Sequence, residues 1–439
     1  MFVDPISVQL PDGIEKDRYA IATYYCSGSR ETNLMEFGTA LAIEQSTGTW
    51  TAVPGETAEV RERCMGRLIG AYEVPSYQIG VPEFVRERHF IIRIAYPTDN
   101  FGPQFAMMLS SVIGNISSSG KVKLIDLEFP DSFLEEFKGP KFGVEGIRKY
   151  LGVYDRPLLN NMIKPCTGLD PKGTAKLAYE VAVGGVDIVK DDELVSNPCY
   201  CPLVERVKYV MEAIKRADEK KREKTLYAFN ITDRPDKILE NAHLAIDAGA
   251  NCLMINYATV GLDTSRMLAE DESIDVPILG HSDYTGATYE CEWSGLSLTL
   301  IGAKLPRLAG LDMIIALTPY GKFPILMDVF LNSAFQMLSQ WKHIRPIFPM
   351  AGGGTTQGHL EDLVKKFGKN VVIAAGGAIH GHPMGAEAGA TAFRFGIDAI
   401  MAGKSLYEAA KENEALKVAI DKWGIYSGAA EKQFSIKNN

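Results

Sequence analysis

One lysine and three carboxylates follow an apolar, β-branched run near the middle of the chain. The run covers residues 186–189, and Lys190, Asp191, Asp192 and Glu193 come directly after it. Mg²⁺ prefers hard oxygen ligands and usually keeps several waters, so two carboxylates and one more anionic oxygen would hold it. A lysine suits such a set only as its carbamate, because CO2 converts the amine into an anionic oxygen ligand. Taken alone, the motif is equally typical of a solvated polar turn before a helix.

Length and composition set the frame for this motif. The chain has 439 residues, of which 46% are hydrophobic and 23% charged, so it can bury a large core, and we expect two domains. The net charge of -9 argues against a nucleic-acid partner. The seven scattered cysteines do not resemble a disulfide framework. With no secretion signal or run of about 18 apolar residues, we expect a cytoplasmic protein without a membrane span.

From about residue 145 onward, short β-branched runs alternate with helical segments, which is typical of parallel strands with crossover helices. Eight such units over about 280 residues predict a (β/α)8 barrel, since an open doubly wound sheet more often has fewer. We place the barrel in a catalytic domain, 144–439, that ends in helices. The predicted strands are 158–164, 186–190, 225–231, 252–257, 276–280, 313–317, 346–349 and 371–375.

The first 143 residues have a different pattern. Residues 19–25 and 90–96 read as strands, and 33–44 has helical spacing. This order predicts a small α+β domain of the ferredoxin-like kind, with helices on one face of an antiparallel sheet. Two polar segments, 44–50 and 114–120, are by themselves more typical of solvated loops than of sites.

Several polar or glycine-rich residues fall at the predicted carboxyl ends of barrel strands, where barrel enzymes place their active sites. Two glycine-rich turns follow the seventh and eighth strands, the usual phosphate position in barrels, because exposed backbone N–H groups there favour an anion. A lone histidine is slightly more often structural, and a glycine turn more often geometry, but their convergence favours a site. The residues are Lys164, Lys190 to Glu193, His281, Gly352 to Gly354, Gly376 and Gly377.

With these residues placed, the chain closely resembles the ribulose-bisphosphate carboxylase large-chain superfamily from about residue 15 to the end of the barrel. The motifs recur in family order and at near-family spacing. They are Ile163-Lys164-Pro165 with Gly168-Leu169, the run from Lys190 to Glu193, Gly321-Lys322, and Gly381-His382-Pro383-Met384-Gly385; in the first domain, residues 44–50 and Gly114-Asn115 match as well.

The resemblance implies a role for each matched residue. Lys190 would be the carbamylated lysine, with Asp192 and Glu193 as the other Mg²⁺ ligands. Lys164 would be the acid/base lysine, and His281 a further catalytic residue. Lys322 would be the lysine of a mobile loop. The first domain would complete the site of a neighbouring subunit in a homodimer, through Glu44, Thr49, Trp50 and Asn115. The phosphate-binding set would be Thr49, Trp50, Lys322, Gly352, Gly353, Gly376 and Gly377.

Departures from the family pattern bear on the subclass. Cys166 replaces the second lysine that carboxylases carry after the first strand. Ser282 and Ile315 stand where the family has a phosphate-binding arginine and a phosphate-contacting histidine, while Thr285 and Ala351 replace a histidine and a serine. A serine or an isoleucine cannot replace a charged phosphate contact. The chain therefore resembles a carboxylase-like (form IV) protein that does not fix CO2 and whose substrate carries a single phosphate or equivalent anion.

The retained residues imply one reaction class, in which a metal makes an α-proton acidic and a lysine or the carbamate removes it to give an enediolate. The enediolate could then be reprotonated elsewhere, as in an enolase, tautomerase or isomerase, or it could arise from a β-keto acid by loss of CO2. The enolases of methionine salvage place a lysine base where this chain has Asn115, which counts against that one activity. The alternatives are a true carboxylase, a non-catalytic relative and an unrelated phosphate-binding barrel enzyme.

Overall fold

The computed structural model describes residues 6–48 and 51–427. Contacts divide the chain into two compact units, Met1–Lys138 with Tyr284–Ile301, and Gly139–Asp283 with Gly302–Asn439. Within the described residues, every helix is too short or too polar to cross a membrane.

The first unit is built on a five-stranded sheet in the order β10-β4-β1-β3-β2. The pairs β1–β3, β1–β4 and β2–β3 are antiparallel, and the short β10 adds to β4 in parallel. Alternate side chains of β1 are fully buried, at Ala20, Ala22, Tyr24 and Cys26, so one face of the strand is built for a core. The strands are β1 (Tyr19–Ser29), β2 (Arg67–Glu73), β3 (Glu87–Pro97), β4 (Val122–Glu128) and β10 (Gly295–Leu296).

Two helices of this unit, α1 and α2, begin at capping side chains, those of Asn33 and Thr57. The Asn33 side chain accepts hydrogen bonds from the backbone N–H groups of Met35 and Glu36, and so starts the predicted helix. The antiparallel sheet and its helices confirm the predicted α+β class. The helical elements are η1 (Pro11–Gly13), α1 (Leu34–Glu44), α2 (Ala58–Cys64), η2 (Thr98–Asn100), α3 (Phe105–Ile113), η3 (Asn115–Ser118), α4 (Asp131–Glu135) and α11 (Gly286–Tyr289).

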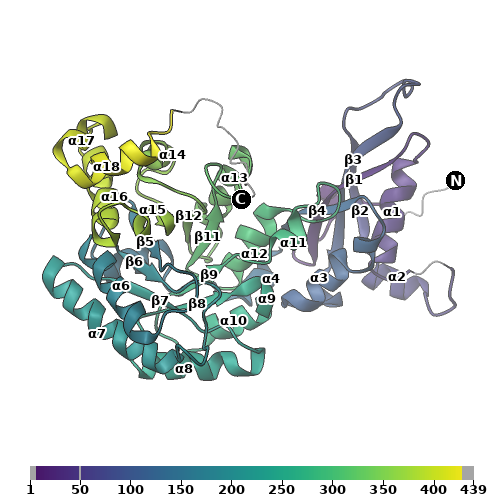
Figure 1. The fold of residues 1–439 in the computed structure, drawn as a ribbon. Helices are drawn as coiled ribbons and strands as arrows, with labels where there is room; N and C mark the ends of the chain where they lie inside the picture. The colour runs from purple at the N-terminus through teal and green to yellow at the C-terminus, as the bar shows by residue number, and fades with distance from the viewer. Residues whose placement is uncertain (1–5, 49–50, 428–439) are drawn as a thin grey trace. The chain divides into compact units, whose positions relative to one another are not determined.

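The second unit is a closed barrel of parallel strands (Figure 1). All eight predicted barrel strands are present, which confirms the predicted fold. They are β5 (Leu158–Met162), β6 (Ile188–Lys190), β7 (Leu226–Asn230), β8 (Cys252–Asn256), β9 (Ile278–His281), β11 (Met313–Leu317), β12 (Phe348–Gly352) and β13 (Val372–Ala375).

Helices cover the outside of the barrel, and the last three follow it toward the C-terminus (Figure 1). They are α5 (Gly143–Leu151), α6 (Pro171–Val183), α7 (Leu203–Lys221), η4 (Pro235–Lys237), α8 (Ile238–Asp247), α9 (Tyr257–Val260), α10 (Leu262–Glu270), α12 (Leu305–Leu308), α13 (Met327–Leu338), η6 (Gln357–His359), α14 (Leu360–Phe367), α15 (Gly377–His380), α16 (Ala386–Met401), α17 (Leu406–Glu412) and α18 (Glu414–Trp423), and a π-helical turn, η5, spans Leu300–Lys304.

An apolar cluster fills the barrel interior and includes Ile188, Ala228, Met254 and Leu279. Side chains two residues apart on a strand share a face. The interior positions that follow at the carboxyl ends of these strands are therefore Lys190, Asn230, Asn256 and His281. A polar layer thus lies directly above the apolar core.

The sequence predicts that residues 1–143 complete a partner's active site and that residues 144–439 form the catalytic domain, and both roles stay predictions. By contact, residues 139–143 group with the barrel, and residues 284–301 group with the first unit. The second grouping follows from β10, where Gly295 and Leu296 pair with Lys123 and Leu124 of β4. A strand of only two residues, β10, gives too short a pattern to predict from the sequence that residues 284–301 belong to the first unit.

Candidate active site

Lys190 is the most deeply buried charged residue of the candidate site, with 0% exposure. It is the last residue of β6, and its Nζ donates to the Asp191 carbonyl at 2.9 Å and to Glu193 Oε2 at 3.3 Å. Burial lowers the pKa of Lys190 from its ordinary value, although Glu193 and Asp192 oppose this shift. Burial therefore works against the charged form of this amine, and the neutral form is the one that attacks CO2.

Glu193 lies between two nitrogen groups. His281 Nε2 is 3.2 Å from Glu193 Oε2, on the same oxygen that faces Lys190. His281 Nδ1 lies 3.2 Å from the backbone N of Asp283 and 3.3 Å from the Asp283 carboxylate oxygen Oδ1, so Asp283 orients the ring. Burial would raise the pKa of Glu193, but the His281 hydrogen bond and the Lys190 charge outweigh it and hold that pKa well below its ordinary value.

Lys164 is the second residue after β5, and its side chain extends to the same site. Its Nζ donates to Asp192 Oδ2 at 2.5 Å and lies 3.1 Å from Cys166 Sγ. Burial lowers the pKa of Lys164, but the hydrogen bonds to Asp192 and Cys166 outweigh burial and raise it. A Cβ added at Gly376 would lie 3.1 Å from Lys164 Cε, so the glycine leaves room for this side chain. The structure thus brings Lys164, Lys190, Asp192, Glu193 and His281 together.

Asp191 has a different role from its neighbours. It accepts from Arg206 Nε at 3.1 Å, from the Tyr227 hydroxyl at 2.7 Å and from the backbone N–H of Asn230 at 2.9 Å. Arg206 is 0% exposed, so the pair is a fully buried ion pair. These partners hold the Asp191 carboxylate within the scaffold and leave Asp192 and Glu193 facing the site.

Two asparagines that the sequence reading missed hold the Glu193 main chain. Asn230 Nδ2 and Asn256 Nδ2 donate to the Glu193 carbonyl at 3.0 and 3.1 Å. Both are the last residues of their strands, β7 and β8. An amide at the end of an otherwise apolar strand is the signal that the sequence offers for these two residues.

The glycine turn after β12 lies against the loop that carries Lys322. The backbone N–H of Lys322 donates to the Gly353 carbonyl at 2.9 Å. A Cβ on Gly321 would lie 1.3 Å from the Gly353 oxygen, so this approach requires glycine. Gly353 and Gly354 have φ values of 91° and 108°, which also favour glycine. Gly352 is buried at the end of β12, whereas Gly377 is exposed after β13.

The first-unit candidates are partly described. Glu44 and Asn115 are exposed, and Gln45 joins their segments, because its Oε1 accepts from the backbone N–H of Ile116 at 3.4 Å. The two polar segments singled out from the sequence are therefore neighbours in this unit. Thr49 and Trp50 lie outside the described residues.

The donor set fits a hard divalent cation. Among residues 6–48 and 51–427, no three His, Cys, Asp or Glu side chains cluster as metal ligands. A cation held by Asp192 and Glu193 would need a further donor. One oxygen of Asp192 faces the Lys164 ammonium group, and one oxygen of Glu193 faces Lys190. Both carboxylates are thus directed at positive charge, and a carbamate on Lys190 would supply the remaining anionic oxygen.

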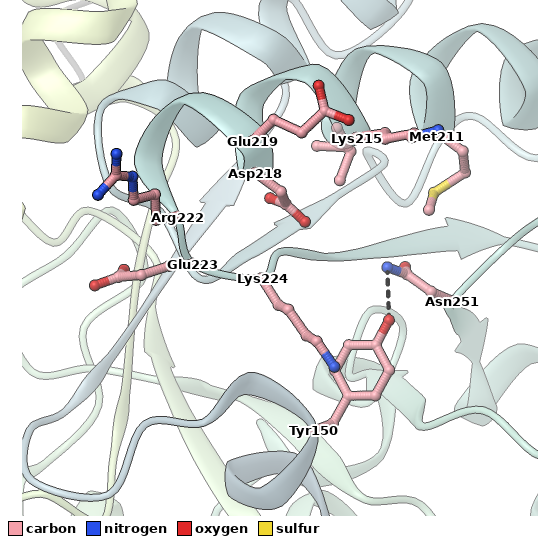
Figure 2. Close-up of a pocket in the computed structure, with 10 residues that line it drawn as sticks. Tyr150, Met211, Lys215, Asp218, Glu219, Arg222, Glu223, Lys224 and Asn251 are labelled. Carbon is pink, nitrogen blue, oxygen red and sulfur yellow. Dashed lines mark hydrogen bonds between the residues drawn. The ribbon is translucent and has the colours of Figure 1, made fainter.

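A cavity of about 440 Å³ lies elsewhere, beside the end of α7 (Figure 2). Lys224 lies over the Tyr150 ring at 5.1 Å, and the Asn251 amide donates to the Tyr150 hydroxyl at 3.3 Å (Figure 2). The residues that line this cavity precede β5, β7 and β8 in the chain, which places them at the amino ends of these barrel strands. Active sites of barrels lie at the opposite ends, so this cavity is separate from the candidate site.

Comparison with known families decides the assignment. The catalytic domain of the ribulose bisphosphate carboxylase large chain matches residues 143–423, and its N-terminal domain matches residues 11–133. The chain belongs to the ribulose bisphosphate carboxylase (RuBisCO) large-chain family. Within it, the chain is a RuBisCO-like member, as its similarity to proteins of that name shows.

Three relatives illustrate the range of this RuBisCO family. A ribulose bisphosphate carboxylase-like protein of Archaeoglobus fulgidus is 53% identical, over 92% of this chain and 93% of that protein. A 2,3-diketo-5-methylthiopentyl-1-phosphate enolase of Geobacillus thermodenitrificans is 38% identical, over 92% and 98%. The solved octameric ribulose-1,5-bisphosphate carboxylase/oxygenase of Pyrococcus horikoshii, in complex with sulfate, has a TM-score of 0.86 at 31% identity, over 95% and 96%.

The residues that depart from the RuBisCO pattern are apolar or small where the structure places them. Ile315 is 6% exposed and belongs to the apolar cluster of the barrel interior, and Ala351 is fully buried on β12. Neither side chain can donate a hydrogen bond to an anion. Cys166 lies beside Lys164, so a weak thiol donor stands where carboxylases carry a second ammonium group.

Replacing Asp191 and Asp192 separately should distinguish scaffold from ligand. Asp191→Ala leaves the Arg206 charge buried and unpaired, and should lower the free energy of unfolding by about 3–5 kcal/mol in urea titrations while Mg²⁺ binding persists. Asp192→Ala should instead abolish Mg²⁺ binding, measured calorimetrically in bicarbonate buffer, with a smaller effect on stability. Loss of Mg²⁺ binding in Asp191→Ala at parental stability would reverse the two roles.

Proposed function

We propose that this chain is an enzyme that enolises a phosphorylated, sugar-derived keto substrate with Mg²⁺ and a carbamate on Lys190, and that it does not fix CO2. The observation that carries the proposal is the fully buried Lys190 amine beside Asp192 and Glu193. A buried lysine with this pKa shift is a poor permanent cation and a good acceptor of CO2.

Lys164 is the residue that would move the substrate proton, at Nζ. In the structure, Lys164 Nζ donates a hydrogen bond from its own proton to Asp192 Oδ2. Asp192, Glu193 and a carbamate on Lys190 would hold Mg²⁺, which would supply Lewis-acid chemistry at the substrate carbonyl. Lys164 Nζ, whose pKa is raised, could donate a proton to a carbon of the enediolate. To act as the base on the α-carbon it would first have to lose one of its own protons.

His281 orients one ligand in this scheme. Its Nε2 faces Glu193, while its Nδ1 faces the backbone N–H and the carboxylate of Asp283. Asn230 and Asn256 fix the Glu193 main chain from two further strands. Glu193 would therefore meet the cation with its direction already set, which is the usual role of groups behind a ligand.

The proton-transfer outcome is the better supported branch of this chemistry. Relatives over nearly the whole chain are named as diketo-methylthiopentyl phosphate enolases, at 38% and 36% identity. Asn115 at the position of the salvage lysine base argues for a different substrate within the same reaction class. Formation of the enediolate from a β-keto acid by loss of CO2 stays the second branch.

We also infer that the active unit is a homodimer. Glu44 and Asn115 lie in neighbouring segments of the first unit, and by family resemblance these segments complete the site of a second subunit. The octameric state of the RuBisCO from Pyrococcus horikoshii supports assembly in multiples of two.

Binding of Mg²⁺ should depend on bicarbonate, because the uncharged amine of Lys190 is a poor third ligand and its carbamate a good one. Lys190→Ala should weaken Mg²⁺ binding by more than about 100-fold and abolish deuterium exchange into a keto sugar monophosphate, followed by NMR. Lys176→Ala, an exposed lysine on α6, is the matched control. Parental Mg²⁺ affinity in Lys190→Ala would disprove the carbamate.

Mixed dimers test the shared site. Neither Lys190→Ala nor Asn115→Ala chains should exchange the substrate proton alone. Co-refolded in equal amounts, they should recover about one quarter of parental exchange activity, because half of the dimers are mixed and each holds one intact site. Absence of rescue in purified mixed dimers would mean that each site is complete within one chain.

The substrate should carry one phosphate or equivalent anion. Thr49, Trp50, Lys322, Gly353, Gly376 and Gly377 would bind it, whereas the opposite side has Ser282, Ile315 and Ala351 in place of charged contacts. Two lost contacts at roughly 1.5–3 kcal/mol each would weaken a second phosphate about 10²- to 10⁴-fold. Dissociation constants for sugar monophosphates and five-carbon bisphosphates measure this difference. Micromolar binding of ribulose bisphosphate, or CO2 fixation on it, would contradict this prediction and favour the alternative that the chain is a true carboxylase.

A further inference from the structure

Tyr320 is buried within an exposed loop. It precedes Gly321 and Lys322 after β11, and it is 7% exposed, whereas Phe323 is 58% exposed and Lys322 is also exposed. A loop that only had to move freely would not need to bury an aromatic ring at its base. The contacts of this ring show what holds it.

Tyr320 packs against two other rings. It stacks on His359 with ring centroids 4.5 Å apart, and Tyr426 meets it edge-on at 5.1 Å. His359 and Tyr426 are themselves 5.6 Å apart, so the three rings form a closed set, here called the aromatic anchor. Burial lowers the pKa of His359 to about 4, so its ring is neutral at pH 7.

The Tyr320 hydroxyl is also held. It donates to the Asp362 carboxylate at the first turn of α14, and Lys366 pairs with the other oxygen of that carboxylate. A hydroxyl bound to an ionised carboxylate makes a stronger hydrogen bond than one bound to a neutral group. The side chain of Tyr320 is therefore fixed by its ring and by its oxygen.

The backbone of residues 424–426, after α18, packs against Gly358, the residue before His359 of the aromatic anchor. The backbone N–H of Tyr426 donates to the Gly358 carbonyl at 3.0 Å. A Cβ on Gly358 would lie 2.0 Å from the Gly424 oxygen, so the two backbones meet at a distance that only glycine allows. This contact sets Tyr426 against the residues that follow the Gly353 turn.

We propose that the aromatic anchor of Tyr320, His359 and Tyr426 is a positioning device that holds Lys322 on the Gly353 turn before any ligand binds. Tyr320 is two residues from Lys322, whose backbone N–H already binds the Gly353 carbonyl. Rigid support of a binding residue lowers the ordering cost of ligand capture. The anion role of Lys322 rests on the proposed function, but its position depends only on the anchor.

Limited trypsin digestion reads that position directly, since cleavage after Lys322 requires the loop to leave the turn. Tyr426→Ala removes one ring contact to Tyr320 and should speed cleavage at Lys322 roughly 2- to 12-fold. Tyr320→Ala should have a larger effect, and Tyr320→Phe, which keeps the stack but loses Asp362, a measurable one. Mass spectrometry of the fragment that begins at Phe323 gives the rate.

Tyr407→Ala is the matched control, because Tyr407 is 65% exposed on α17 and outside the anchor. It should leave cleavage at Lys322 at the parental rate. Thermal unfolding identifies any variant that loses the whole fold, and in that case Tyr320→Phe decides the question. Parental cleavage rates in the folded Tyr426→Ala and Tyr320→Phe variants would overturn the proposal.

Inorganic phosphate separates this proposal from the proposed function. If Lys322 and the glycine turns bind an anion, phosphate should slow cleavage at Lys322 in the parent and do so at higher concentration in Tyr426→Ala. Faster cleavage in Tyr426→Ala without any phosphate effect would uphold the anchor and count against the anion site. A phosphate effect of equal midpoint in both proteins, with equal cleavage rates, would refute the anchor alone.

Discussion

The burial of one amine governs this site. Lys190 ends a barrel strand whose preceding interior residue, Ile188, belongs to the apolar core, so its Nζ lies where a permanent charge is costly. Glu193 and Asp192 offset part of that cost, yet burial still lowers the pKa of Lys190. Burial thus opposes the charged form of this amine, while the two carboxylates favour it. The other groups at the barrel mouth offset this cost. Asp192 and Glu193 supply negative charge, and His281, Asn230 and Asn256 hold Glu193 in place.

The division of labour among three consecutive acids shows how this is achieved. Asp191 gives its carboxylate to Arg206, Tyr227 and the Asn230 backbone, and so closes the strand end with a buried ion pair. Asp192 instead meets Lys164, and Glu193 meets Lys190 and His281. The three adjacent carboxylates thus have separate cationic or hydrogen-bonding partners. Asn230 and Asn256 complete the arrangement by gripping the Glu193 carbonyl.

Much of this arrangement was predictable from the sequence, because apolar strand runs are dense and regular in the barrel. The eight strands and the gathering of Lys164, Lys190, Glu193 and His281 at their carboxyl ends follow from that pattern. In the first unit, β2 and β4 were missed, since their mixed polar and apolar residues give a weaker signal than the long apolar strands β1 and β3. The pairing of β10 with β4 depends on backbone hydrogen bonds that no side chain announces. The anchor was equally hidden, because Tyr320, His359 and Tyr426 meet only once the chain is folded.

The residues of β11 and β12 differ from the turns that follow them in how they could treat an anion. In the turns, Gly353 and Gly354 adopt positive φ, and Lys322 is held against them by its own backbone and by the buried ring of Tyr320. Within the two paired strands, Ile315 belongs to the apolar core, and Ala351 offers no polar atom in its side chain. Desolvating a phosphate costs free energy everywhere, and it is recovered only where donors are already in place. Under the proposed function, this order of residues along β11 and β12 would favour a ligand whose charged end meets the glycine turns.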